Sequence, residues 1–387
     1  MDDNPLSEEN IELGKVELMN PEVTGSNQSN SEFNAAASKD QFLSGIGKSE
    51  TPQVEILPKN TSFQSQFEKR EQYDFAEGKV EVVDITPEEM TDETPVIFAP
   101  GWMGTFQKHE KTLEAVHKNK RRVVSPVYSR NGGRVEDDGK NRKIELQKAG
   151  MLDKLIATKQ FDKVDAIAQS EGSINVLLDA MANPDRYRNI VLMNPAGLIG
   201  EDNPIAFFKR FQESVKGKKA EVVEATKVLD VKNGEADLGN YTREELEAIR
   251  EKVKAISGGV MGDIMKNPFR TASELGALAD SDIYTMLKDL REKGVSISVI
   301  AGVDDKLFPI GKIIDHMNKN KAVDGSSNAP LEGFYAVKGG HSEIYSDLKF
   351  TTAQGEATQD TDTERHMFVA IDALNNMQRR RVATAQK

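Results

Sequence analysis

The segment 164–173 combines a strand, a serine and a helix in a pattern that suits nucleophilic chemistry. An apolar run, 164–168, leads into Ser170, and a helical run begins directly after it. Small residues stand two positions before and two positions after the serine, at Ala168 and Gly172. A tight strand-to-helix turn needs such residues, because the backbone folds closely on itself and lifts the serine above the sheet. Ser170 is therefore the predicted nucleophile, although the pattern alone also fits an ordinary helix cap.

A second turn, after the apolar strand predicted over 95–99, could stabilise negative charge. Gly101 in this turn would let the backbone approach a substrate, and the N–H of Trp102 could then face the nucleophile. The N–H of Glu171 lies at the positive end of the helix that follows the serine. Together these two groups are the predicted oxyanion hole. The alternative is a simple strand-ending turn whose tryptophan, the only one in the chain, packs in the core.

Two later strand ends carry an acid and a histidine. The apolar run 297–303 ends at Asp304 and Asp305, and the run 334–337 ends shortly before His341. Serine is a weak nucleophile without a base in hydrogen-bond reach, and the imidazole needs a carboxylate to fix its tautomer. The carboxyl ends of successive parallel strands meet at one edge of a sheet. We therefore expect the serine, an acid and the histidine to converge there.

The elements that must position these groups alternate along the chain. The patterns predict strands over 79–85, 95–99, 122–128, 164–168, 189–193, 295–301 and 334–337, and helices over 106–119, 142–159, 171–182, 309–319 and 364–380. Such alternation favours an α/β fold with a mostly parallel central sheet flanked by helices.

Three regions complete the predicted organisation. Residues 1–65 are expected to be a disordered acidic tail, since residues 1–60 hold eleven acids against four lysines. The core is expected to comprise 66–200 and 286–387. Between them no convincing strand occurs, and Thr242 with Glu245 forms a capping box ahead of an apolar helical pattern. We expect 201–285 to be an inserted helical lid over the carboxyl edge of the sheet.

Composition excludes several chemistries. The chain has no cysteine, which excludes disulfides, thiolate metal sites and a cysteine nucleophile. The five histidines include no pair at zinc-binding spacing, and no glycine-rich nucleotide fingerprint follows the first strand. We therefore expect neither a metal nor a cofactor. The histidines at 109, 117, 316 and 366 are expected to be surface groups.

Charge and hydropathy bear on partners and location. The net charge of −12 disfavours binding to nucleic acid. No run of about 18 apolar residues occurs, so no integral membrane segment is expected. The amino terminus is acidic and polar rather than basic and apolar, which is unlike a secretory signal and favours a cytoplasmic location. The oligomeric state stays open.

These motifs resemble the α/β-hydrolase superfamily, whose chain order is nucleophile, acid, histidine. The resemblance covers about residues 75–380. It implies that Ser170 is the nucleophile, Asp305 the acid and His341 the base, and that Trp102 and Glu171 donate to the oxyanion.

The resemblance also chooses between the two acids. In the superfamily the acid usually stands four residues before a proline, which favours Asp305, four before Pro309, over Asp304. Three positions depart from the family pattern. Pro100 replaces the histidine that precedes the oxyanion glycine, Ala168 replaces the first glycine of the elbow, and Ser173 follows the elbow glycine.

The resulting prediction is a serine hydrolase that cleaves an ester or related acyl bond of a small-molecule substrate through an acyl-enzyme. Four apolar residues near the start of the expected lid suit a modest apolar acyl group, and they equally suit a helix packing face: Ile205, Phe207, Phe208 and Phe211. The alternatives are a non-catalytic binding or scaffold protein on the same fold, an acyltransferase, or a hydrolase of carbon–carbon bonds.

Overall fold

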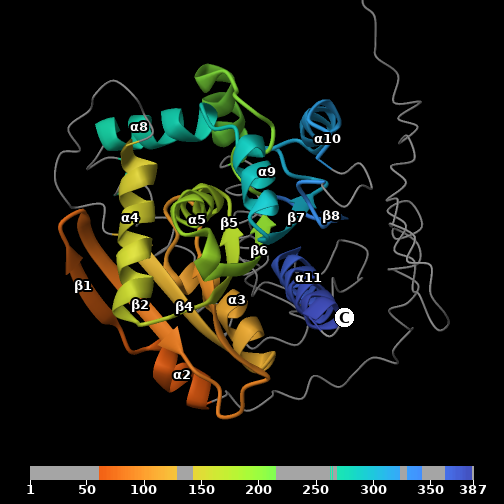
Figure 1. Ribbon diagram of the computed structural model, residues 1–387. Helices are drawn as coiled ribbons and strands as arrows, with labels where there is room; N and C mark the ends of the chain where they lie inside the picture. Colours follow the sequence, from red (N-terminus) through yellow and green to blue (C-terminus); the bar gives the residue numbers. More distant parts are fainter. Residues whose placement is uncertain are drawn as a thin grey trace, which may run out of the picture.

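The computed structural model describes residues 61–128, 143–214, 268–322, 329–341 and 362–385, with the isolated positions 262 and 264. One eight-stranded sheet organises these residues (Figure 1). Its strands are β1 (Glu71–Phe75), β2 (Gly78–Ile85), β3 (Asp92–Ala99), β4 (Arg121–Tyr128), β5 (Val164–Gln169), β6 (Tyr187–Met193), β7 (Ser296–Gly302) and β8 (Gly333–Val337). Their order in the sheet is β1-β2-β4-β3-β5-β6-β7-β8.

Most of the sheet is parallel. β1 pairs with β2, and β2 with β4, in antiparallel register, whereas all pairs from β4 across to β8 are parallel. β5 and β7 are buried along almost their whole length, as expected for parallel strands that helices cover on both faces. The parallel strands therefore direct their carboxyl ends to one common edge.

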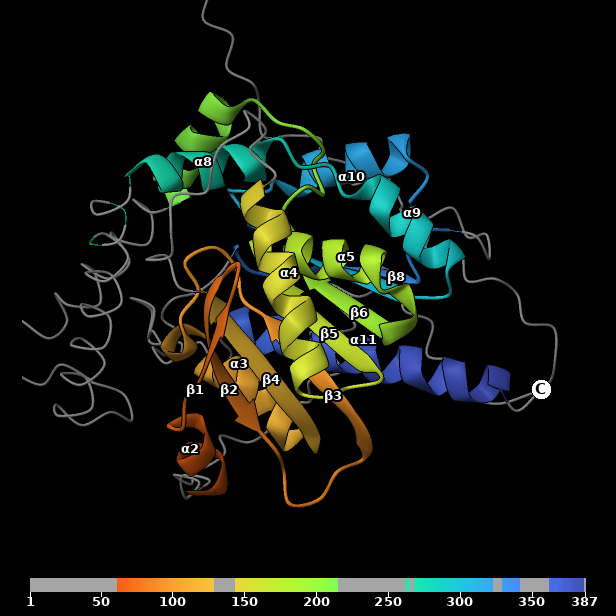
Figure 2. The same cartoon turned by 60° about the vertical axis from the view of Figure 1, so that its left-hand side comes forward.

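Helices cover both faces of the sheet (Figure 2). They are α2 (Thr61–Phe67), α3 (Phe106–Lys118), α4 (Lys143–Thr158), α5 (Glu171–Ala182), α8 (Pro268–Ala279), α9 (Tyr284–Glu292), α10 (Ile310–Lys319) and α11 (Asp362–Ala385), with a short 3-10 helix, η1 (Pro184–Arg186). Residues 204–214 are also helical. The described helices contain no stretch that is long and apolar enough to cross a membrane.

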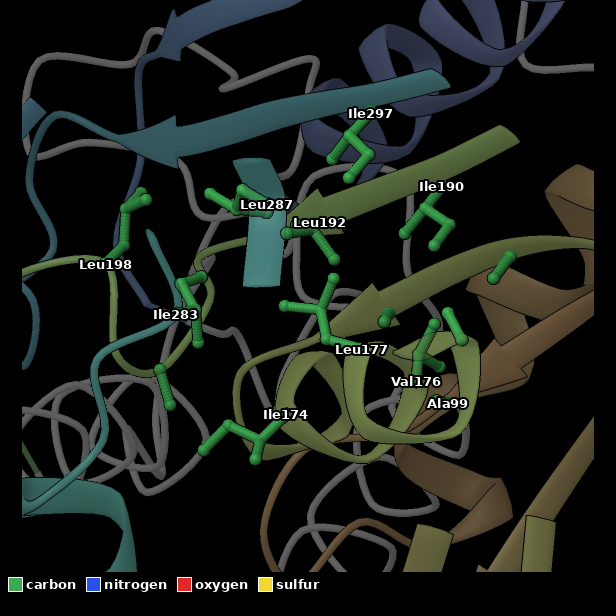
Figure 3. Close-up of a cluster of buried hydrophobic side chains, with 14 of the residues drawn as sticks. Ala99, Ile174, Val176, Leu177, Ile190, Leu192, Leu198, Ile283, Leu287 and Ile297 are labelled. Atoms are coloured by element: carbon green, nitrogen blue, oxygen red, sulfur yellow. The ribbon is translucent and has the colours of Figure 1, made fainter. Parts of the chain in front are cut away.

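Two hydrophobic clusters, one on each face, hold the layers together. Along β3, Ile97 and Ala99 point into the cluster under α4, α5 and α9, whereas Val96 and Phe98 point into the cluster under α2, α3 and α11. This alternation is the two-residue period of a strand. Figure 3 shows the first cluster, in which Leu177 of α5 lies among side chains of the sheet and of α9. The sheet is thus anchored on both faces directly below its carboxyl edge.

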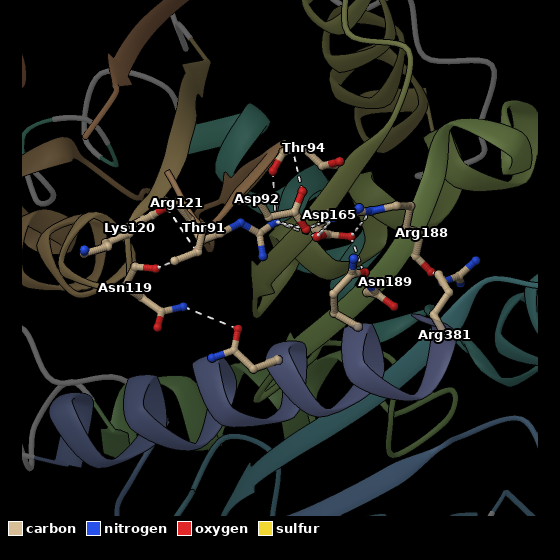
Figure 4. Close-up of polar contacts among 12 residues, drawn as sticks. Thr91, Asp92, Thr94, Asn119, Lys120, Arg121, Asp165, Arg188, Asn189 and Arg381 are labelled. Carbon is tan, nitrogen blue, oxygen red and sulfur yellow. Dashed lines mark hydrogen bonds and ion pairs between the residues drawn. The ribbon is translucent and has the colours of Figure 1, made fainter. Parts of the chain in front are cut away.

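The opposite edge, where the parallel strands begin, carries a buried ionic network around Asp165 (Figure 4). The Asp165 carboxylate is fully buried. It accepts hydrogen bonds from Arg121 and Arg188, both at 2.6 Å, and from the Asn189 amide at 2.9 Å. These residues stand at the starts of β4, β5 and β6. The network therefore fixes the strand starts and lies away from the edge where the reactive side chains were expected.

The predicted fold class is confirmed, because the sheet is mostly parallel and helices flank it. Each of the seven predicted strands corresponds to one of β2 to β8. The sequence did not reveal β1, a mostly exposed edge strand. It also did not reveal α2, whose residues 61–65 were assigned to the tail. Phe63 and Phe67 of α2 are buried against the sheet face that carries α3.

The expected lid is described only in part. Within 201–285, residues 204–214 and α8 are helical, while the Thr242–Glu245 capping box lies outside the described residues.

The prediction that the remaining histidines lie on the surface is wrong for His117 and His366, which are 7% and 3% exposed, and His109 and His316 are half-buried. Both lie on helices that pack on the same sheet face, α3 and α11. His117 is further covered by Phe63, whose ring centroid lies 5.6 Å from the imidazole.

Candidate active site

Ser170 occupies the sharp turn between β5 and α5. Its backbone has φ 51° and ψ −120°, a conformation that side-chain-bearing residues rarely adopt. The start of α5 lies so close to the end of β3 that a Cβ on Gly172 would lie 2.3 Å from the Ala99 carbonyl oxygen. This contact explains why a glycine stands two residues after the serine. Ala168, two residues before it, is fully buried between neighbouring strands, so a methyl group is accommodated there.

The structure brings Ser170, His341 and Asp305 together in one hydrogen-bonded chain. His341 Nε2 lies 2.9 Å from Ser170 Oγ, and His341 Nδ1 lies 2.8 Å from Asp305 Oδ2. The other carboxylate oxygen, Asp305 Oδ1, accepts hydrogen bonds from the N–H groups of Leu307 and Phe308 at 2.8 and 2.9 Å. The acid is therefore fixed by its own loop and leaves one oxygen for the imidazole.

Asp304 lies in a different position from its neighbour. Asp304 Oδ2 accepts a hydrogen bond from the Gly339 N–H at 3.3 Å, and the Asp304 N–H donates to the Gly339 carbonyl at 3.0 Å. Asp304 thus ties its loop to the backbone that precedes His341, and it does not contact the imidazole. Of the two acids that the residue pattern alone left open, Asp305 is the one that contacts the imidazole.

The predicted oxyanion residues flank the serine. A Cβ on Gly101 would lie 3.0 Å from Ser170 Cβ, so the β3–α3 loop passes directly beside the nucleophile. Trp102 follows in that loop, and Glu171 is the first residue of α5. The N–H groups of a first helical turn have no acceptor within the helix. The N–H of Glu171 is therefore suited to receive negative charge next to Ser170.

Asn194 is a structural part of the site that the sequence did not identify. It follows β6 in a left-handed conformation, φ 44°. Its amide nitrogen donates to the His341 carbonyl at 2.8 Å, and its amide oxygen accepts from the Gly302 N–H at 2.7 Å. Asn194 thereby joins the histidine loop to the end of β7, which precedes the acid. Its place at a strand end was the only available signal.

The helix at 204–214 packs over both halves of the site. Phe207 stacks on Phe308 at 5.9 Å, and Phe308 in turn meets the His341 ring edge-on at 5.0 Å. Farther along the helix, Phe211 contacts Trp102 at 5.1 Å. These contacts favour the packing role for Phe207 and Phe211, whereas Ile205 and Phe208 are exposed.

The side chains of Trp102 and Glu171 lead into a buried charged cluster, which the sequence did not reveal. Trp102 Nε1 donates to Glu274 Oε2 at 2.7 Å, and Lys148 Nζ donates to Glu171 Oε1 at 2.6 Å. Burial lowers the pKa of Lys148, but the surrounding glutamates outweigh it, and the pKa is raised overall. Burial raises the pKa of Glu145 well above its ordinary value, and the charge of Glu171 raises it further.

No family model matches the chain, and no curated protein sequence matches it. Among solved structures, the chain is similar to the enol-lactonase from Burkholderia xenovorans LB400, with 13% identity, a TM-score of 0.49, and 79% of this chain and 100% of that chain covered. It is also similar to a thermophilic esterase from Thermogutta terrifontis, with 15% identity, a TM-score of 0.46, and coverage of 80% and 99%. A third similar structure is a serine hydrolase from Cycloclasticus zankles, with 14% identity, a TM-score of 0.47, and 72% of this chain and 93% of that chain covered.

The chain's own topology defines its fold. The sheet begins with an antiparallel hairpin and continues as parallel strands, and a serine occupies the sharp β5–α5 turn at the carboxyl edge. An acid follows β7 and a histidine follows β8, in the chain order serine, aspartate, histidine. These features are those of the α/β-hydrolase fold.

Proposed function

We propose that the protein is a serine hydrolase that cleaves an ester or related acyl bond through an acyl-enzyme on Ser170. The observation that carries this proposal is the continuous hydrogen-bonded chain from Ser170 Oγ through His341 to Asp305, with distances of 2.9 and 2.8 Å. A serine and a base within hydrogen-bond reach, with the base oriented by a third group, form an activated nucleophile.

In the first half-reaction Ser170 Oγ attacks the acyl carbonyl carbon while His341 Nε2 takes the hydroxyl proton. Asp305 accepts a hydrogen bond from His341 Nδ1–H, which fixes the tautomer and stabilises the imidazolium. The carbonyl oxygen becomes negative, and the N–H groups of Trp102 and Glu171 stabilise it. When the tetrahedral intermediate collapses, His341 returns the proton to the leaving group and the acyl-enzyme remains.

In the second half-reaction water replaces the leaving group. His341 removes a proton from the water, whose oxygen attacks the acyl carbon, and the same oxyanion donors stabilise the second intermediate. Collapse of that intermediate breaks the bond to Ser170 Oγ, and His341 reprotonates the serine. The products are the free acid and the regenerated hydroxyl.

The test is intact-protein mass spectrometry after treatment with a small fluorophosphonate or aryl phosphonate, which reacts with activated serines. We expect one adduct on the wild type and none on Ser170→Ala. Ser173→Ala is the matched control, because the Ser173 hydroxyl lies three residues further on and donates to the Ala168 carbonyl; it should be labelled like the wild type. Wild-type protein without an adduct would favour the non-catalytic scaffold.

Untreated wild-type enzyme is then supplied with p-nitrophenyl esters of increasing chain length, with aryl thioesters and with lactones. Release of the free acid supports the hydrolase. Acyl products formed only when an added alcohol or amine is present would favour the acyltransferase alternative, since the same acyl-enzyme serves both reactions.

A further inference from the structure

A buried polar chain links the side chains of the two proposed oxyanion residues. Trp102 Nε1 donates to Glu274 Oε2 at 2.7 Å. Lys148 Nζ lies 3.7 Å from Glu274 Oε1 and donates to Glu171 Oε1 at 2.6 Å. The chain therefore runs from the β3–α3 loop, through α8 and α4, to the first residue of α5. It joins the two sides of the oxyanion hole by a route that does not pass through the nucleophile.

The buried surroundings of these hydrogen-bonded side chains restrict the positions that they can adopt. Glu274 is 1% exposed, and Lys148 and Glu171 are also buried. In such a poorly solvated place a charged group cannot replace a lost partner with water, so each side chain is confined to the arrangement that satisfies it. Arg270, one turn before Glu274 on α8, donates to Glu274 Oε1 at 3.1 Å and holds this carboxylate from the other side.

The charges in the cluster also balance. Lys148 lies among three glutamates, Glu145, Glu171 and Glu274. Because burial raises the pKa of Glu145 well above its ordinary value, this carboxyl group favours its neutral form. Two cations, Lys148 and Arg270, then face two carboxylates. A carboxylate next to a developing oxyanion would oppose it, and the Lys148 ammonium group offsets the charge of Glu171.

We infer that Lys148 and Glu274 are positioning residues of the oxyanion hole. They hold Trp102 and Glu171, and Lys148 in addition neutralises the carboxylate that adjoins the nucleophile. This inference rests on the proposed serine-hydrolase function. Neither residue touches the reacting atoms, and both act through the two N–H donors. Because these donors bind the oxyanion, whose charge develops in the transition state, the effect falls mainly on the transition state.

The first test is steady-state kinetics of Lys148→Met on an activated ester. We expect kcat to fall roughly 10- to 100-fold with KM little changed, because misplaced oxyanion donors weaken transition-state binding. The matched control is Lys154→Met, since Lys154 lies on the same helix and pairs with Glu77 at the surface; its kcat should match the wild type. The double variant Lys148→Met/Glu171→Gln should recover the part of the lost kcat that comes from charge, because it removes the carboxylate that Lys148 neutralises.

The second test is a double-mutant cycle on the hydrogen bond between Trp102 and Glu274. Glu274→Leu and Trp102→Phe each remove the indole–carboxylate hydrogen bond, and phenylalanine keeps an aromatic ring against Phe211. If that bond positions the loop, each variant lowers kcat, and the double variant is no worse than the poorer single variant. Glu274→Gln keeps an acceptor oxygen for the indole and should retain more kcat than Glu274→Leu.

The outcomes separate the inference from the proposed function. A wild type that neither hydrolyses activated esters nor reacts with the phosphonate defeats the proposed function. An active wild type with unchanged kcat in folded Lys148→Met and Glu274→Leu overturns the inference. The inference is also overturned if the double variant at Lys148 and Glu171 recovers none of the kcat lost in Lys148→Met while its melting temperature falls in parallel. That pattern would mark a purely structural cluster. If Lys148→Met does not fold, the cycle at Trp102 and Glu274 decides.

Discussion

At the scale of single residues, Ser170 combines reactivity with a strained backbone. A residue other than glycine at φ 51° is stabilised only by what surrounds it. The Ser170 N–H donates to the Met193 carbonyl at 3.0 Å, and the Ser170 carbonyl accepts from the N–H groups of Ser173 and Ala196 at 3.1 and 3.2 Å. The surrounding turn thus holds the nucleophile in place at the expense of stability.

This strain gives a stability prediction. Ser170→Gly and Ser170→Ala both lose the hydroxyl, but only glycine relieves the positive φ. We expect Ser170→Gly to be about 1 kcal/mol more stable than Ser170→Ala, once the entropy of glycine in the unfolded chain is subtracted from the strain relieved. Urea unfolding of the two variants measures this difference. Equal stabilities would show that the turn is unstrained.

The two adjacent acids give a second prediction at this scale. Asp305→Asn removes the carboxylate that orients His341, so we expect kcat to fall by roughly 100- to 10,000-fold. Asp304→Asn should leave kcat near the wild-type value, since Asp304 contacts the Gly339 backbone and not the imidazole. Kinetics of both variants on one activated ester provide the comparison. A larger loss in Asp304→Asn would reverse the assignment of the acid.

Single residues also show what the sequence could and could not reveal. The convergence of Ser170, Asp305 and His341 was predictable because each follows an apolar strand and carries a side chain of distinct chemistry. Asn194 also follows a strand, but an asparagine is common in any turn. Its role depends on Gly302 and His341, which lie more than a hundred residues away in the chain. Contacts of this kind leave no local pattern.

At the scale of elements, the two edges of the sheet have different tasks. The carboxyl edge carries the proposed catalytic groups, and the amino edge carries the buried network around Asp165. The prediction of strands succeeded because buried parallel strands are short apolar runs. It failed for β1, because an exposed edge strand with polar side chains lacks that signal.

The network at the amino edge should contribute stability rather than activity. Asp165→Asn removes the fully buried carboxylate between Arg121 and Arg188 and leaves them only Asp92 as an acidic partner, and we expect the free energy of unfolding to fall by about 3–5 kcal/mol. Asp153→Asn is the control, because that carboxylate is 41% exposed in its pair with Arg186, and it should change stability by less than about 1 kcal/mol. Denaturant unfolding tests both, and kcat of folded Asp165→Asn should stay unchanged. Similar stabilities for the two variants would contradict this role.

The packing of α2 on α3 gives a prediction with a pH dependence. Both ring nitrogens of His117 are buried without a hydrogen-bond partner, and burial lowers the pKa of His117 below its ordinary value of 6.5. As pH falls through 6.5, the unfolded chain takes up a proton before the folded chain does, so stability decreases. His117→Leu removes this effect and the unpaired polar atoms.

We therefore expect His117→Leu to melt at a higher temperature than the wild type, with a gap that widens as the pH falls from 7 towards 5. Thermal unfolding by circular dichroism at several pH values measures it. The control is Gln107→Leu, which replaces an exposed and uncharged residue of the same helix and for which the gap should not widen in this way. A gap that stays constant or narrows at acid pH would contradict the buried neutral imidazole.

At the scale of the whole molecule, the fold brings together groups from most of the chain. The site draws on the β3–α3 loop, the β5–α5 turn, and the segments after β6, β7 and β8, while the helix at 204–214 and α8 contact it from the predicted insertion. The sequence allowed the order of the loops and turns to be predicted, because each of them follows a predicted strand. The cluster of Lys148, Glu171 and Glu274 was not, because its members lie on three helices whose packing the sequence pattern does not specify.

Rapid quenching in acid during turnover of p-nitrophenyl acetate tests whether Ser170 forms the proposed acyl-enzyme. Mass spectrometry of the quenched and digested protein should find acetyl on the peptide that contains Ser170. Asp305→Asn should show less of this adduct at the same time after mixing, and Ser170→Ala none. Ester turnover without an adduct on Ser170 at any quench time, or the same adduct level elsewhere in Ser170→Ala, would contradict the account.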